Sequence, residues 1–74
     1  MSEEAKVYVV IENAARMPVI KTGIIEKHLP NQMCLVALDD GEHGAYPEKV
    51  VFYALNMAEF IQQELLRKAQ AVLV

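Results

Sequence analysis

The sequence predicts a mainly β fold with one C-terminal α-helix, in which a small Src-homology-3-like barrel of about five strands precedes an amphipathic helix. Two patterns in the 74 residues indicate this class. From residue 6 to about residue 53, runs of β-branched and aromatic residues alternate with turn residues. From about residue 56, apolar residues recur at helical spacing without proline or glycine. A chain of this length holds one domain, so we expect a single domain over residues 1–74, with a β body at about 6–53 and a helix at about 56–72.

The first two predicted strands flank a loop that ends at a proline. Residues 6–11 are rich in valine, isoleucine and tyrosine, which predicts a strand. Pro18 disfavours the helical region for the residue before it, so residues 12–18 are interpreted as a loop. Residues 19–27 predict the second strand, and Gly23 in its middle indicates a sharp bend or the close approach of another backbone.

An apolar run and a hairpin signal predict the next elements. Residues 28–32 contain a Pro-Asn pair and predict a turn. Residues 33–38 are a continuous apolar run of strand length, which predicts a central strand buried on both faces. The Asp-Gly pair within residues 39–44 is a strong hairpin signal, because glycine takes positive φ at no steric cost.

The segment after Gly44 has two interpretations. In the first, residues 45–46 form a short strand, residues 47–49 a tight turn and residues 50–53 a last strand, and the helix starts near Asn56. In the second, Pro47 begins one long helix that continues to the end of the chain. We favour the first, because residues 50–53 are four consecutive β-formers and Asn56 and Glu59 have the spacing of a capping box.

Five short strands are expected to close into a barrel, because bending one sheet onto itself removes both exposed edges. Gly23 would permit the bend. The residues predicted to line the interior are Ile25, Leu35 or Val36, Leu38 and Val50.

Three local motifs occur in a characteristic order: TGII at residues 22–25, LDDG at 38–41 and PEKV at 47–50. This order resembles the small Src-homology-3-like barrels, among them the KOW-type bacterial mini-barrels, over about residues 19–52. In those barrels a glycine bends the second strand, an acidic Asp-Gly hairpin joins the next two, and a proline-led turn precedes the last. The resemblance implies the barrel fold. This chain departs from that pattern in two ways. KOW motifs that bind RNA usually lie in basic surroundings, whereas this chain is acidic. The C-terminal helix is an addition that the minimal barrel lacks.

The predicted helix carries more apolar surface than a small barrel covers. Its apolar residues span about half of the helical circumference, wider than the roughly 100° stripe that one core contact needs. We therefore expect a non-catalytic protein–protein interaction module or small accessory subunit that self-associates through this helix or binds another protein. The residues predicted to bind the partner are Met57, Phe60, Ile61, Leu65 and Val72.

The charge of the chain argues against nucleic-acid binding as its main function. Seven Lys and Arg residues against ten Asp and Glu residues give a net charge of −3, the wrong sign for a protein that binds phosphate backbones. The alternative function is a weak RNA- or ribosome-associated KOW-like barrel. Its nucleic-acid contacts would be Lys21, Lys27 and Lys49.

No motif in the sequence predicts catalysis, a cofactor or a metal. Residues 39–43 contain three acidic residues and His43, but they lack calcium-loop and zinc spacing, so we interpret them as a solvated turn. His28 and Cys34 have the chemistry of a base and a nucleophile, but a thiol within an apolar run is buried and inert. We predict no catalytic residue, no cofactor, no metal site and no small-molecule substrate.

The sequence predicts a cytoplasmic protein. Its N-terminus is acidic, whereas a secretory signal begins with basic residues. No stretch approaches the roughly 18 apolar residues of a membrane span. The one cysteine has no partner for an intrachain disulfide.

Overall fold

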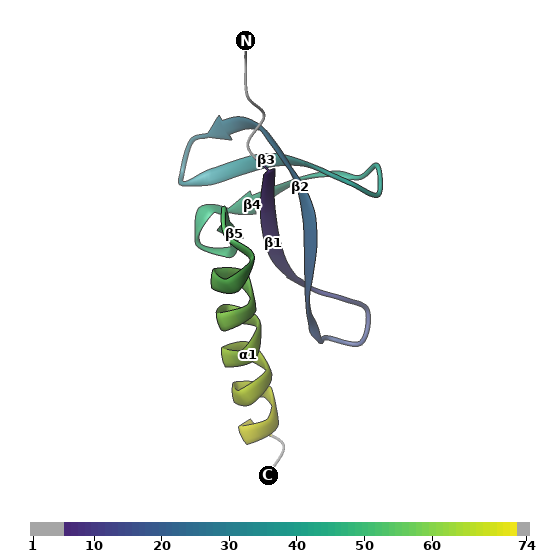
Figure 1. Ribbon diagram of the computed structural model, residues 1–74, viewed down its shortest axis with the longest axis vertical. Coiled ribbons are helices and arrows are strands. Elements are labelled where there is room, and N and C mark those ends of the chain that lie inside the picture. The colour runs from purple at the N-terminus through teal and green to yellow at the C-terminus, as the bar shows by residue number, and fades with distance from the viewer. Residues whose placement is uncertain (1–5, 73–74) are drawn as a thin grey trace.

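The computed structural model describes residues 6–72, and the side chains of residues 6–69. Five strands form one antiparallel sheet with the order β4-β3-β2-β1-β5, and one helix follows them (Figure 1). The predicted class, mainly β with a C-terminal helix, is confirmed. The elements are β1 (Lys6–Glu12), β2 (Pro18–Leu29), β3 (Met33–Leu38), β4 (His43–Pro47), the 3-10 turn η1 (Glu48–Val50), β5 (Val51–Phe52) and α1 (Leu55–Val72).

Strand β2 pairs with both β1 and β3, and Gly23 lies where the two ladders meet. It is opposite Val7 in β1 and opposite Leu38 in β3. A Cβ at this position would lie 2.5 Å from the carbonyl oxygen of Ala37, closer than real Cβ atoms approach. The close backbone approach predicted for Gly23 is confirmed. Beyond it, the β2–β3 register shifts between Ile25 and Lys27, which bends β2 a second time.

The core lies between β1 and β3. Val7, Val9, Cys34, Val36 and Leu38 form one buried cluster. Ile25 and Val50, both predicted to line the interior, pack against this cluster and are partly buried.

The prediction that β3 is buried on both faces is wrong. Its residues alternate, with Cys34, Val36 and Leu38 buried and Met33, Leu35 and Ala37 half-buried. Of the alternatives Leu35 and Val36, the interior residue is therefore Val36. The reason is the placement of α1, which contacts β1, β2 and β5 most extensively and extends away from β3 and β4 (Figure 1).

The sheet is bent but open. In the described residues its two edge strands, β4 and β5, are not paired with each other. β5 is only two residues long and pairs with β1 through Phe52 and Val51. Pro47 and η1 span the gap between the edges. The strand interpretation of this segment is confirmed, although Val50 belongs to η1 and not to the last strand.

α1 begins one residue before the predicted start at Asn56. The carbonyl of Ala54 accepts hydrogen bonds from the amides of Met57 and Ala58 at 3.2 and 3.3 Å, so Asn56 lies inside the first turn. The capping box predicted for Asn56 and Glu59 is wrong, because a residue inside the helix cannot cap it. No helix within residues 6–72 combines the length and the apolar character that a membrane crossing requires.

The helix lies along the β1–β2 hairpin. Ala58 is fully buried, and Val10 is 3% exposed on the face of β1 opposite to Val9. The side-chain amide of Gln62 donates a hydrogen bond to the carbonyl of Pro18 at 3.1 Å. A second apolar layer, smaller than the core, therefore joins α1 to the outer face of the hairpin.

Candidate functional site

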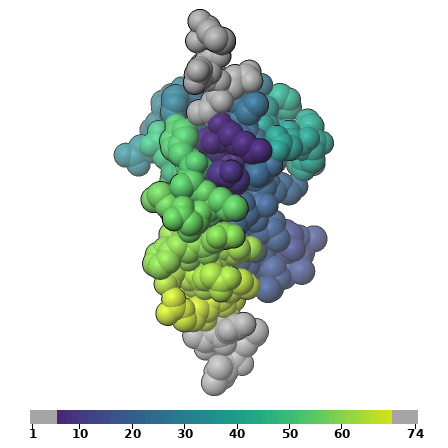
Figure 2. Space-filling view, viewed as in Figure 1, coloured from purple at the N-terminus to yellow at the C-terminus, as the bar shows by residue number. Residues whose placement is uncertain are grey.

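Large apolar side chains are exposed where α1 begins. Tyr53, Met57 and Phe60 are 63%, 56% and 63% exposed, and we call these three residues the α1 patch. Met57 and Phe60 are three residues apart and share one side of the helix. Figure 2 shows α1, green to yellow, forming much of the surface on the viewer's side. A small protein that leaves three large apolar side chains exposed to water has a surface suited to binding a partner.

The residues predicted to bind a partner do not all lie on this surface. Met57 and Phe60 are exposed, and Leu65 is 39% exposed. Ile61 is half-buried. The side chain of Val72 lies outside the described residues. Ala58 explains the division, because its small side chain lets one stripe of the helix approach the hairpin closely and leaves the neighbouring stripe uncovered.

One ion pair lies on α1 beyond the α1 patch. Arg67 Nη2 lies 2.5 Å from Glu64 Oε2, one helical turn away on the exposed surface. The surface next to Phe60 therefore carries no local excess of charge from this pair.

The acidic hairpin between β3 and β4 is tied to β2. Lys21 Nζ lies 2.8 Å from Asp40 Oδ2, and the hydroxyl of Thr22 donates to Asp39. The hydrogen bond and charge of Lys21 lower the pKa of Asp40, and the same contact with Asp40 raises the pKa of Lys21. His43 Nδ1 lies 3.0 Å from Glu26 Oε1. The polar groups of this hairpin thus hold two strands and a turn together.

Two of the three lysines predicted to contact nucleic acid lie at opposite ends of β3. Lys21 is bound to Asp40, which follows β3. Lys49 is in η1, whose first amide, that of Glu48, donates to Gln32 just before β3. The six residues of β3 between these points span about 20 Å. Lys27 is exposed on β2. Lys21 and Lys49 therefore do not form one continuous basic strip.

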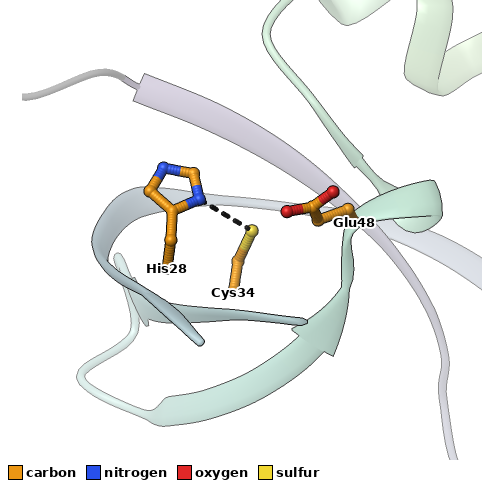
Figure 3. A group of neighbouring side chains, drawn as sticks. All are labelled: His28, Cys34 and Glu48. Carbon is orange, nitrogen blue, oxygen red and sulfur yellow. Dashed lines mark hydrogen bonds between the residues drawn. The ribbon is translucent and has the colours of Figure 1, made fainter. Parts of the chain in front are cut away.

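A second cluster of functional groups lies between β2, β3 and η1. His28 and Cys34 are directly opposite each other in the β2–β3 ladder, with Nδ1 of His28 3.9 Å from Sγ of Cys34. Glu48 reaches the same place from the first residue of η1. One ligand atom from each of the three side chains lies within 4.8 Å of the others. Figure 3 shows the thiol between the imidazole and the carboxylate.

These three side chains line an open pocket of about 290 Å³. Cys34 is 2% exposed, whereas His28 and Glu48 are exposed. Burial raises the pKa of the Cys34 thiol, and the negative charge of Glu48 raises it further. The thiol therefore stays protonated at neutral pH, which disfavours nucleophilic catalysis. The remaining lining residues are Ile25, Val51 and Tyr53.

Sequence reasoning paired His28 with Cys34 but missed Glu48. A signal existed, because the Asp-Gly hairpin sets the β3–β4 register and places Tyr46 opposite Cys34. Glu48, two residues after Tyr46, follows at the same end of β3.

Comparison with protein-family models, curated proteins and solved structures finds no match to this chain.

Proposed function

We propose that this protein is a non-catalytic protein–protein interaction module that self-associates through the α1 patch. The observation that carries this proposal is the 56–63% exposure of Tyr53, Met57 and Phe60. Burying such side chains removes apolar surface from water, at about 25 cal/mol per Å². Aromatic residues and methionine are also the types enriched at protein interfaces.

A second copy of the chain is the partner best supported. In a two-fold dimer the same patch is used twice, so the α1 patch of one copy packs against the α1 patch of the other. The net charge of −3 opposes dimerisation, most strongly where charges lie at the contact. The Glu64–Arg67 pair beside the patch is internally neutral, so this pair adds no net charge to the contact.

The expected affinity is moderate. An 18-residue helix is about 27 Å long, and the patch occupies only its first two turns and Tyr53 just before it. Stable interfaces bury at least about 1,000 Å² in total, so the patch alone supports a reversible, concentration-dependent dimer. A role as a small accessory subunit, docked on a larger assembly through the same patch, is the hetero-association form of this proposal.

We include in the proposal the resemblance to Src-homology-3-like barrels and a cytoplasmic location. The close approach at Gly23, the Asp-Gly hairpin and the 3-10 turn after Pro47 support the resemblance. The free Cys34 supports a reducing compartment. The alternative of an RNA-associated barrel has less support, because Lys21 is neutralised by Asp40 and lies far from Lys49.

The test is the solution mass as a function of concentration. Light scattering and sedimentation equilibrium on the full chain should show a mass that rises from monomer toward dimer. Met57→Lys should remain monomeric at concentrations where the wild type is dimeric. Met17→Lys is the matched control, since Met17 is 44% exposed in the β1–β2 loop and receives the same substitution. A wild type that stays monomeric throughout, or equal effects of the two variants, would refute the proposal.

A further inference from the structure

The pocket between β2, β3 and η1 gathers three side chains of different metal-binding chemistry. Cys34 offers a sulfur, His28 a ring nitrogen and Glu48 a carboxylate oxygen. Each comes from a different element, so the fold and not a local sequence motif brings them together. We propose that His28, Cys34 and Glu48 form a binding site for a divalent transition-metal ion, with Zn²⁺ as the best match.

The distances are close to those of a tetrahedral site. Bonds of about 2.3 Å to sulfur and 2.0–2.2 Å to nitrogen and oxygen place neighbouring ligand atoms about 3.4–3.6 Å apart. The His28–Cys34 pair is at 3.9 Å, and the three ligand atoms lie within 4.8 Å of one another. Closing the site requires the ligand atoms to approach one another by at most about 1.4 Å. Cys34 is fixed in the core, whereas His28 and Glu48 are exposed and able to rotate toward it.

The backbone holds the three positions in place. His28 and Cys34 are Cα partners in the β2–β3 ladder, so their spacing is set by strand pairing. The amide of Glu48 donates to the carbonyl of Gln32 at 2.9 Å, which anchors η1 to the turn between β2 and β3. Metal binding therefore needs side-chain rotation only and leaves the fold unchanged.

The donor set selects zinc over the alkaline-earth ions. Thiolate and imidazole suit Zn²⁺, whereas Mg²⁺ and Ca²⁺ take six or more oxygen ligands. The negative charge of Glu48 repels a negatively charged thiolate at Cys34. A cation bound between the two groups attracts both and so offsets this repulsion. The thiolate and the carboxylate then balance the two positive charges of the ion. Three protein ligands leave a fourth position that faces the open pocket, where water can bind.

The test uses the full chain after removal of bound metal with a chelator. Zn²⁺ is titrated in competition with a chromophoric chelator, and Co²⁺ is used as a spectroscopic probe. We expect one equivalent of Zn²⁺, a thiolate-to-cobalt charge-transfer band in the near ultraviolet, and no competition from Mg²⁺ or Ca²⁺. His28→Gln and Glu48→Gln should each weaken Zn²⁺ binding by at least about tenfold. Both residues are exposed, so neither variant should fail to fold.

His43→Gln is the matched control for the histidine, because His43 is exposed and contacts Glu26 outside the pocket. It should bind Zn²⁺ as tightly as the wild type. Cys34→Ser should remove the charge-transfer band. Since Cys34 is buried, circular dichroism must first show that this variant is folded, and the two exposed variants decide the question if it is not. Failure to take up stoichiometric Zn²⁺, or equal affinity in His28→Gln, Glu48→Gln and the wild type, would overturn the proposal.

Discussion

Gly23 lies where the β1–β2 and β2–β3 ladders meet, and the backbone of β3 approaches it closely. Replacing Gly23 with alanine tests whether the sheet requires a residue without a side chain at this position. The added Cβ would lie 2.5 Å from the carbonyl oxygen of Ala37 and 3.0 Å from Cα of Leu38. Both are backbone atoms, which cannot rotate away from a clash. The sheet must therefore shift at β2, its central strand, and strain the ladders to β1 and β3.

The expected loss follows from two opposing effects. Overpacking costs about 1–3 kcal/mol, and contact with backbone atoms places Gly23→Ala at about 3 kcal/mol. Alanine also restricts the unfolded chain, which returns about 0.4–1 kcal/mol. The net loss in unfolding free energy is about 2 kcal/mol. At about 0.05–0.15 kcal/mol per residue, a chain of 74 residues has only about 4–11 kcal/mol in total.

The assay is urea denaturation followed by circular dichroism, at concentrations low enough to keep the protein monomeric, because association shifts apparent stability. Gly44→Ala is the matched control. Its Cβ would lie 2.8 Å from the hydroxyl of Tyr46, the end of a side chain that can move. We expect this variant to lose less than about 1 kcal/mol. Equal losses in the two variants, or no loss in Gly23→Ala, would show that the close approach does not constrain the sheet.

Two further predictions concern titratable groups. The pKa of Asp40 is lowered and that of Lys21 is raised, so their contact stabilises the fold between the ordinary pKa values of the two groups. Asp40→Asn should therefore lower the melting temperature slightly at neutral pH. The difference should vanish as acid protonates Asp40, or as the pH rises through the raised pKa of Lys21; a difference independent of pH would contradict this. The raised pKa of Cys34 predicts slow alkylation of the metal-free protein at neutral pH and faster alkylation in Glu48→Gln; alkylation at the rate of a free thiol would contradict it.

Local chemistry made most of the secondary structure predictable. The bounds of β3 match the predicted residues 33–38, because a Pro-Asn turn precedes this run and an Asp-Gly turn follows it. The strand β4 and the turn that follows Pro47 were also predictable from local residues, because an Asp-Gly turn precedes the strand and a proline ends it. The start of α1 was displaced by one residue, since the backbone of Ala54 and not the side chain of Asn56 accepts the first helical bonds.

Burial and the candidate sites depended on tertiary placement, which local patterns do not specify. The apolar run of β3 is the same whether one face or both are covered, and only the position of α1 along the hairpin decides this. The apolar excess of the helix was predictable from its composition, but its division between a buried Ala58 and an exposed Phe60 was not. Lys21 was predicted as a possible nucleic-acid contact, and its ion pair with Asp40 was not predictable, because local patterns do not specify which side chains of the hairpin face β2.

None of the three metal ligands belongs to the α1 patch, so the dimer and the metal site can each fail without the other. Tyr53 is the one residue common to both, since it lines the pocket and also belongs to the α1 patch. Met57→Lys should therefore abolish dimerisation and leave Zn²⁺ affinity unchanged. His28→Gln should weaken Zn²⁺ binding and leave dimerisation unchanged. If Met57→Lys also weakened Zn²⁺ binding, the metal site would depend on association, and the two sites would be coupled. The double comparison, made at a protein concentration below and above the dimerisation midpoint, distinguishes a site complete within one chain from one completed by association.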